Sequence, residues 1–253
     1  MLLACDIGNT NIKTGLFERE KLEAFYSFNS YSLFLEYLKS ITFNRIAISS
    51  VVPSITGKLK NDLTVFSKAE SFIINKSVNF NLKISYDSFD TLGIDRICSA
   101  EGAFALFTNS VEFENYNPGT FLLSVDLGTA TTINFIRYPG EFIGGVIAPG
   151  INTMFSSLNK NTAQLPHIDE SFYKTLIGSD TKSSIASGVI NSTTGLIEKS
   201  IAHLQTNFSA RKIKIFLTGG NAEKVLPNLT FEYEFEKGLV LIGIKAIHDL
   251  NFK

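Results

Sequence analysis

The chain has 253 residues, of which 44% are hydrophobic and 19% charged, with a formal net charge of −1. The apolar content excludes a disordered chain, and the balanced charge argues against nucleic acid or an anionic membrane as a partner. The two cysteines and three histidines show no metal-ligand spacing. With no signal peptide and no apolar run long enough to span a membrane, we expect a cytoplasmic protein.

The first predicted element is a β-hairpin. Residues 2–6 form an apolar run that ends at Asp6, a turn containing Gly8 follows, and Lys13–Phe17 resumes as a strand. This pattern is typical of two strands joined by a tight turn. The elements expected next are helices at 32–39, 54–67 and 95–107 and strands at 45–52 and 71–75.

The same pattern then restarts. An apolar strand at 120–126 ends in Asp126, a turn containing Gly128 follows, and a second strand occupies 132–137. A repeat at half-chain spacing predicts two similar domains, and alternating strands and helices predict α/β layering. Because 108–119 is polar and rich in turn residues, we predict domains at 1–115 and 116–253. The remaining expected elements are a glycine- and proline-rich loop at 144–150, helices at 151–160, 183–206 and 238–250, and a strand at 212–217.

The two Asp-x-Gly turns are candidate phosphate loops. A carboxylate at the end of a strand can face a divalent metal and its phosphates, and a glycine such as Gly8 lets main-chain amides approach phosphate oxygens closely. A hairpin turn explains the first copy equally well, because Gly, Asn and Asp favour turns. Recurrence of the turn at Asp126 favours nucleotide binding, with the two loops facing each other across a cleft.

The segment Gly93–Arg96 opens the predicted helix at 95–107 and has two interpretations. Asp95 could cap this helix and Arg96 could be a surface residue. Alternatively, Asp95 could be the general base of a phosphoryl transfer to an alcohol, and Arg96 could bind an anionic group of the substrate. The spacing alone does not choose between them. The glycine clusters at 144–150 and 218–220 could be plain turns or places where main chain passes a nucleotide.

Taken in order, six motifs resemble the type III pantothenate kinases: Asp6–Thr10, Ser50–Pro53, Gly93–Arg96, Asp126–Thr131, Gly144–Gly150 and Gly178–Thr181. The resemblance extends from residue 1 to about 245. It implies an α/β fold of two ribonuclease-H-like domains of the actin-like ATPase type, with the active site in the cleft between them. It also implies ATP-dependent phosphorylation of pantothenate to 4′-phosphopantothenate, the first step of coenzyme A synthesis, by a homodimer.

The resemblance also assigns roles to residues. Asp95 would be the catalytic base, and Asp6 would lie near Mg²⁺ held through the phosphates. Asp126 would bind a monovalent cation, K⁺ or NH₄⁺. Thr218–Gly220 would lie near the adenosine. The residues implied to bind ATP and its phosphates are Asp6, Ile7, Gly8, Asn9, Thr10, Asn11, Ile12, Lys13 and Thr129. Those implied to bind pantothenate are Tyr86, Gly93, Ile94, Asp95, Arg96 and, from the neighbouring subunit, Thr181.

Two other functions are compatible with these motifs. One is a sugar or acetate kinase of the same superfamily, which a panel of acceptors with ATP would distinguish. The other is a non-catalytic regulatory relative, since some members of the family were first described as accessory factors for transcription. The presence of Asp6, Asp95 and Asp126 and the near-neutral charge favour the kinase.

Overall fold

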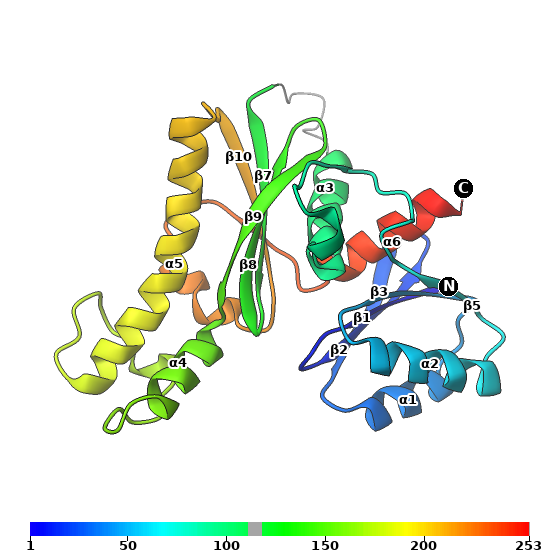
Figure 1. Ribbon diagram of the computed structural model, residues 1–253, viewed down its shortest axis with the longest axis horizontal. Coiled ribbons are helices and arrows are strands. Elements are labelled where there is room, and N and C mark those ends of the chain that lie inside the picture. The colour runs from blue at the N-terminus through cyan, green and yellow to red at the C-terminus, as the bar shows by residue number, and fades with distance from the viewer. Residues whose placement is uncertain (111–117, 253) are drawn as a thin grey trace. The chain divides into compact units, whose positions relative to one another are not determined.

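The computed structural model describes residues 1–110 and 118–252. The predicted domain boundary at residue 115 falls outside these residues and stays a prediction. The chain forms two compact units, each of which contains one of the two Asp-x-Gly turns (Figure 1). Unit 1 comprises residues 1–116, 140–143 and 238–253, and unit 2 comprises residues 117–139 and 144–237.

Unit 1 is built on a five-stranded sheet with the order β3-β2-β1-β4-β5. Its central strand β1 pairs antiparallel with β2 and parallel with β4, which confirms the predicted hairpin. All six residues of β1 are buried, as expected for a strand covered on both faces. The strands are β1 (Leu2–Ile7), β2 (Ile12–Glu18), β3 (Lys21–Phe28), β4 (Arg45–Ser50) and β5 (Glu70–Ile73).

Helices cover both faces of this sheet: α1 (Tyr31–Ser40) and α2 (Pro53–Phe66) on one face, α3 (Ile94–Thr108) and α6 (Leu239–Asn251) on the other (Figure 1). Leu3 and Cys5 of β1 pack in the first hydrophobic layer, whereas Leu2 and Ala4 pack in the second. Successive side chains of a strand point to opposite faces, so Asp6 belongs to the face that α3 and α6 cover.

Helices α3 and α6 touch backbone to backbone. A Cβ atom on Gly102 would lie 2.0 Å from the carbonyl oxygen of Leu239, and one on Gly243 would lie 1.8 Å from that of Cys98. Only glycine permits so close an approach. The contact places α6, the last helix of the chain, in unit 1 and fixes the position of α3.

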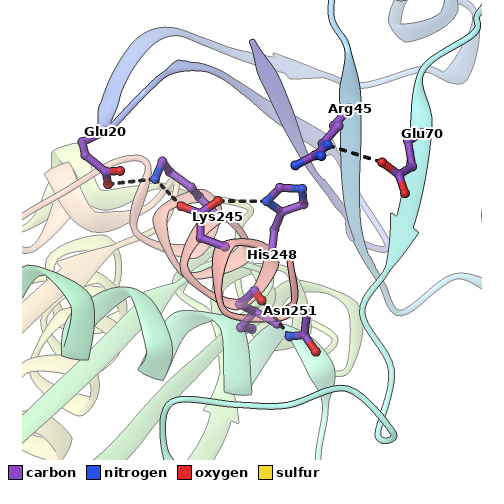
Figure 2. Close-up of polar contacts among 8 residues, drawn as sticks. Glu20, Arg45, Glu70, Lys245, His248 and Asn251 are labelled. Carbon is purple, nitrogen blue, oxygen red and sulfur yellow. Dashed lines mark hydrogen bonds and ion pairs between the residues drawn. The ribbon is translucent and has the colours of Figure 1, made fainter. Parts of the chain in front are cut away.

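The C-terminal end of α6 is held by a polar network (Figure 2). Lys245 Nζ lies 2.8 Å from a carboxylate oxygen of Glu20 and 2.5 Å from one of Asp249. The imidazole Nδ1 of His248 lies 2.9 Å from the other oxygen of Asp249. Asn251 accepts the main-chain N–H of Asn79 at 3.0 Å. These contacts tie α6 to the β2–β3 turn and to the segment that precedes α3.

Unit 2 contains the sheet order β11-β10-β7-β8-β9. Strand β7 pairs antiparallel with β8 and parallel with β10, which is the arrangement of β1, β2 and β4 in unit 1. The first residues of β9, Glu141 and Phe142, belong to unit 1 and pair there with β6. The remaining elements are β6 (Lys83–Ile84), β7 (Thr120–Leu127), β8 (Ala130–Arg137), β9 (Glu141–Pro149), α4 (Ile151–Lys160), α5 (Thr181–Asn207), β10 (Lys212–Thr218) and β11 (Glu234–Phe235).

The prediction of a loop at 144–150 is wrong, because most of this segment continues strand β9. Exposed and half-buried residues alternate from 145 to 149, as in a strand with one solvent-facing side. The three glycines and Pro149 concealed this alternation from the sequence. Pro149 is tolerated because it is the last residue of the strand.

The α-helices of the described residues and the strands β1, β2, β4, β5, β7, β8 and β10 lie where the sequence predicted them, whereas β3, β6 and β11 were not predicted. Among the described residues, no helix combines the length and the apolar character needed to cross a lipid bilayer.

Candidate active site

The first Asp-x-Gly turn lies at the end of β1. Asp6 pairs with Lys13 of β2 on one side and with Ser49 of β4 on the other. The carboxylate is 8% exposed and accepts a long hydrogen bond of 3.4 Å from the hydroxyl of Ser49. The turn is closed by the amide of Gly8, which donates to the carbonyl of Asn11 at 3.0 Å.

The rest of this turn is open. Asn9 and Thr10 are exposed, and Gly8 and Asn11 are half-buried. A Cβ atom on Gly8 would lie 3.2 Å from the carbonyl oxygen of Asn11, a tight but not impossible contact. The turn therefore presents polar side chains and main chain next to a nearly buried carboxylate, as a phosphate loop requires.

Asp95 lies in the first turn of α3. Gly93 precedes the helix and provides no side-chain cap. A Cβ atom on Gly93 would lie 2.3 Å from a carboxylate oxygen of Asp95, so this carboxylate folds back over Gly93. A side chain at residue 93 would force the Asp95 carboxylate to move from this position. The N-terminus of α3 also favours a negative charge at Asp95.

The charges of Asp6 and Asp95 both act on the thiol of Cys98. Burial raises the pKa of the Cys98 thiol well above its usual range, and the charges of Asp6 and Asp95 raise it further. A hydrogen bond with Ser49 acts in the opposite direction. The two carboxylates thus act on one buried thiol, although Asp6 belongs to strand β1 and Asp95 to helix α3.

Two of the predicted pantothenate residues, Tyr86 and Arg96, lie together in unit 1. Arg96 is 5% exposed, so it is not a surface residue. Its guanidinium carbon lies 5.7 Å from the ring centroid of Tyr86 and 5.8 Å from that of Phe142. Stacking on two rings holds the guanidinium in a fixed orientation, as recognition of a planar anion requires. No sequence motif includes Phe142.

Glu101 of α3 also contributes to this cluster, and no sequence motif includes it. Its side chain is fully buried and accepts the main-chain N–H of Leu82 at 2.9 Å and the side-chain amide of Asn81 at 2.8 Å. Burial raises the pKa of Glu101, whereas these hydrogen bonds lower it. Glu101 thereby anchors the segment that leads to Tyr86. A Glu inside an amphipathic helix gives no signal for such a role.

The second Asp-x-Gly turn, in unit 2, is supported from several sides. Asp126 pairs with Thr132 of β8 and Thr218 of β10. Gly219 follows β10 with φ +102°, and a Cβ atom there would lie 2.5 Å from a carboxylate oxygen of Asp126. The backbone N–H of Asn221 donates to the carbonyl of Leu127, at 2.9 Å.

The carbonyls of this turn have further donors. The side chain of Asn221 donates to the Gly128 carbonyl at 2.9 Å. The Thr129 carbonyl accepts the N–H of Gly150 at 2.9 Å and the hydroxyl of Thr153 at 2.8 Å. Both glycine clusters predicted from sequence therefore contact the second turn. The side chain of Thr129 is exposed.

Thr181 is the first residue of α5. Asp180 caps this helix by accepting the Ser183 N–H at 3.0 Å, within a capping box. Thr181 lines a cavity of about 780 Å³ in unit 2, together with residues of α4 and α5 such as Met154, Leu158 and Ile185. Its lining is mainly apolar.

The donor set suits Mg²⁺ held through phosphates. Mg²⁺ usually takes one or two protein carboxylates and keeps water and phosphate ligands. Asp6 is a single carboxylate at an open turn, and no group of three or more His, Cys, Asp or Glu side chains within the described ranges could hold a metal ion. ATP with a divalent ion fits this arrangement, because the nucleotide completes the coordination.

Solved structures define the class of fold. A Campylobacter jejuni protein described as a Baf family transcriptional activator superposes with a TM-score of 0.64 at 23% identity, over 98% of both chains. A Listeria monocytogenes protein described as an N-acetylmannosamine kinase superposes with a TM-score of 0.52 at 13% identity, over 98% of this chain and 99% of its own. The chain has the two-domain actin-like ATPase fold, as the resemblance implied.

Sequence comparison identifies the family. The profile of the type III pantothenate kinases matches residues 2–203. A type III pantothenate kinase from Dehalococcoides mccartyi is 31% identical over 99% of this chain and 96% of its own length, and one from a Geobacter species is 29% identical over 99% and 100%. The chain belongs to the type III pantothenate kinase family.

Proposed function

We propose that this protein transfers the γ-phosphoryl group of ATP to the primary hydroxyl of pantothenate, giving 4′-phosphopantothenate for coenzyme A synthesis. Membership of the family supports the reaction. The observation that carries the assignment of residues is the placement of two carboxylates in unit 1: Asp6 is nearly buried beside the open turn after β1, and Asp95 lies in the first turn of α3. A phosphoryl transfer to an alcohol needs a carboxylate for the proton and an anchor for the phosphates, and unit 1 supplies one of each.

The roles follow from the two turns of unit 1. Asp95 accepts the proton of the hydroxyl as its oxygen attacks the γ-phosphorus. The residues Asp6 to Lys13 bind the phosphates, and Asp6 faces the divalent ion, which offsets negative charge on the transferring group.

The remaining roles concern the acceptor, the second turn and the oligomer. Arg96 binds the carboxylate of pantothenate beside Tyr86, whose ring lies under the guanidinium. Asp126 binds a monovalent cation, K⁺ or NH₄⁺, and Thr129 contacts ATP. The protein acts in the cytoplasm as a homodimer in which Thr181 reaches the pantothenate of the partner; the apolar cavity beside Thr181 supports a covered surface there.

Asp95→Asn tests the catalytic role. We expect turnover with pantothenate to fall by about 10² or more, the usual range for loss of a general base, while ATP binding is retained. Glu36→Gln, which removes an exposed carboxylate of α1, is the matched control. A coupled kinase assay gives turnover, and fluorescent-nucleotide titration gives ATP affinity. Near-normal turnover of Asp95→Asn would refute the assignment.

The same assay tests the substrate and the cation. Wild-type protein is supplied with pantothenate, a sugar or acetate, each with and without K⁺. Phosphate on a sugar or on acetate, and none on pantothenate, would favour another kinase of the superfamily. No transfer to any acceptor would favour a regulatory relative. Equal rates with and without K⁺ or NH₄⁺ would remove the proposed role of Asp126.

A further inference from the structure

A cavity of about 620 Å³ in unit 1 lies at the end of β1 that is opposite to the Asp6 turn. Its lining includes Leu2 of β1 and the two partners of Leu2 in the sheet, Phe17 of β2 and Arg45 of β4. Asp6 follows four residues further along the strand, a distance of about 13 Å. The cavity is therefore separate from the phosphate turn, and its volume is typical of a small-molecule site.

Cations outnumber carboxylates in the lining of this cavity. The two carboxylates, of Glu20 and Asp249, both pair with the ammonium of Lys245, at 2.8 and 2.5 Å (Figure 2). Arg19 and Arg45 remain as further cations. Arg19 is exposed and forms no ion pair within residues 1–110 and 118–252. The cavity therefore favours a negatively charged ligand.

Arg45 offers its guanidinium to such a ligand. Its Nε lies 3.3 Å from a carboxylate oxygen of Glu70, an exposed residue that does not line the cavity. Its guanidinium carbon lies 5.0 Å from the ring centroid of Phe252, which does line it. Ion pairs between exposed side chains are weak, so a ligand can compete with Glu70. An arginine binds carboxylate and phosphate groups through two parallel hydrogen bonds.

A buried imidazole lies in the same wall. Nδ1 of His248 is 2.9 Å from a carboxylate oxygen of Asp249, and the ring stacks on Phe252 with the centroids 4.7 Å apart. The other ring nitrogen, Nε2, is buried and has no hydrogen-bond partner among the residues that the structure describes. Such an atom is destabilising, and a polar group of a ligand would offset that cost. Arg45 and His248 both contact Phe252, so a ligand that shifts this ring would reach both.

We propose that this cavity binds a small organic anion, a carboxylate or a phosphate ester that also has an aromatic or other apolar portion. Arg45 and Arg19 bind the anionic group. The apolar portion packs on Phe17 and Phe252. Because the site is separate from the Asp6 turn, the inference does not depend on the proposed phosphoryl transfer.

Amide NMR spectra of ¹⁵N-labelled protein test the proposal, in the presence of Mg²⁺ and a non-hydrolysable ATP analogue. The probes are phenyl phosphate, benzoate and inorganic phosphate. We expect phenyl phosphate or benzoate to shift the amides of residues 17–20 and 245–252 and to leave those of residues 8–11 unchanged. The tighter of the two identifies the anionic group. Inorganic phosphate should bind about tenfold more weakly than phenyl phosphate, because it has no apolar surface to bury.

Two variants and a matched control assign the contacts. Arg45→Gln and Arg19→Gln should each weaken binding of the tighter probe about tenfold, because each removes charge-assisted hydrogen bonds. Arg19→Gln breaks no ion pair within the described ranges, so it tests the site even if Arg45→Gln disturbs the fold. Lys21→Gln is the control: Lys21 follows Glu20 and pairs with Glu23 at 3.0 Å, but it does not line the cavity. Its affinity should stay within about twofold of wild type.

Four outcomes would overturn the inference. One is the absence of shifts at residues 17–20 and 245–252 with every probe at millimolar concentration. A second is shifts confined to residues 8–11, which would mean that the probes bind the phosphate turn alone. A third is equal weakening by Lys21→Gln and Arg45→Gln, which would indicate non-specific attraction to a positive surface. Equal affinities for inorganic phosphate and phenyl phosphate would exclude the organic ligand.

Discussion

The two Asp-x-Gly turns come from the same strand arrangement but differ in how they are held. In unit 1 residues 8–11 separate the last paired residues of the hairpin, Ile7 and Ile12. In unit 2 residues 128–130 separate Leu127 and Thr131, so this turn is one residue shorter. The longer turn is open, whereas the shorter one is enclosed by neighbouring chain.

The difference in support is larger than the difference in length. In the first turn, Ser49 donates a long hydrogen bond of 3.4 Å to the Asp6 carboxylate. Around the second turn, Gly219, Asn221, Gly150 and Thr153 all make contact. The same strand arrangement thus carries an open turn in unit 1, where the proposed phosphate contacts need access, and an enclosed turn in unit 2.

The largest expected effect comes from Gly219→Ala. The new methyl would lie 2.5 Å from the Asp126 carboxylate and from the Leu127 main chain, at a residue with φ +102°. Backbone strain and overpacking together should cost about 3 kcal/mol of unfolding free energy. Thermal melting should then occur about 10 °C lower.

Gly220→Ala is the control for that variant. A Cβ atom at Gly220 meets no atom within 4 Å. Its melting temperature should stay within about 2 °C of wild type, because a compatible Gly→Ala change alters stability by about 1 kcal/mol or less. Equal melting of Gly219→Ala and Gly220→Ala would show that the second turn is not enclosed as described.

A smaller effect is expected from removing one supporting side chain on each turn. Asn221→Ala leaves the Gly128 carbonyl without its side-chain donor and should cost about 1–3 kcal/mol. Ser49→Ala removes only a 3.4 Å bond to Asp6 and should cost about 1 kcal/mol or less. Urea unfolding measures both. A larger loss for Ser49→Ala would reverse the comparison of the two turns.

The repeated unit could be predicted because its signal is local. An apolar strand, an Asp, a glycine turn and a second strand follow one another within a few residues, at Asp6 and again at Asp126. Pairing then follows from the short turns, and the structure confirms both hairpins. The helix start at Gly93–Arg96 was also expected from the motif, although the contact of Asp95 with Gly93 was not.

Tertiary partners could not be predicted. Nothing in the sequence connects Cys98 with Asp6, or Lys76 with Leu92, since each pair meets only after the sheet and α3 have packed. The backbone contact of α3 with α6 likewise depends on Gly243, which lies far along the chain. Because of this packing, residues 238–253 belong to unit 1 although they follow unit 2 in the sequence. Strand β9 was missed because glycine and proline are poor indicators of strand.

The smallest expected effect tests whether the rigid turn matters for ATP or only for stability. Thr153→Val keeps the side-chain shape and removes the hydroxyl that donates to the Thr129 carbonyl, which retains the Gly150 N–H. Loss of one partly exposed hydrogen bond should cost about 0.5–1 kcal/mol. If Thr129 contacts ATP, the KM for ATP should rise about two- to fivefold while the KM for pantothenate stays unchanged.

Thr153→Ser restores the hydroxyl and is the control for that variant. A rise in the KM for ATP that Thr153→Ser reverses would link the enclosed turn to nucleotide binding. A drop in melting temperature with an unchanged KM would instead mean that Gly150 and Thr153 stabilise unit 2 alone. In that case the enclosed turn would serve the fold, and the open turn at Asp6 would bear the phosphate contacts without help from Thr129.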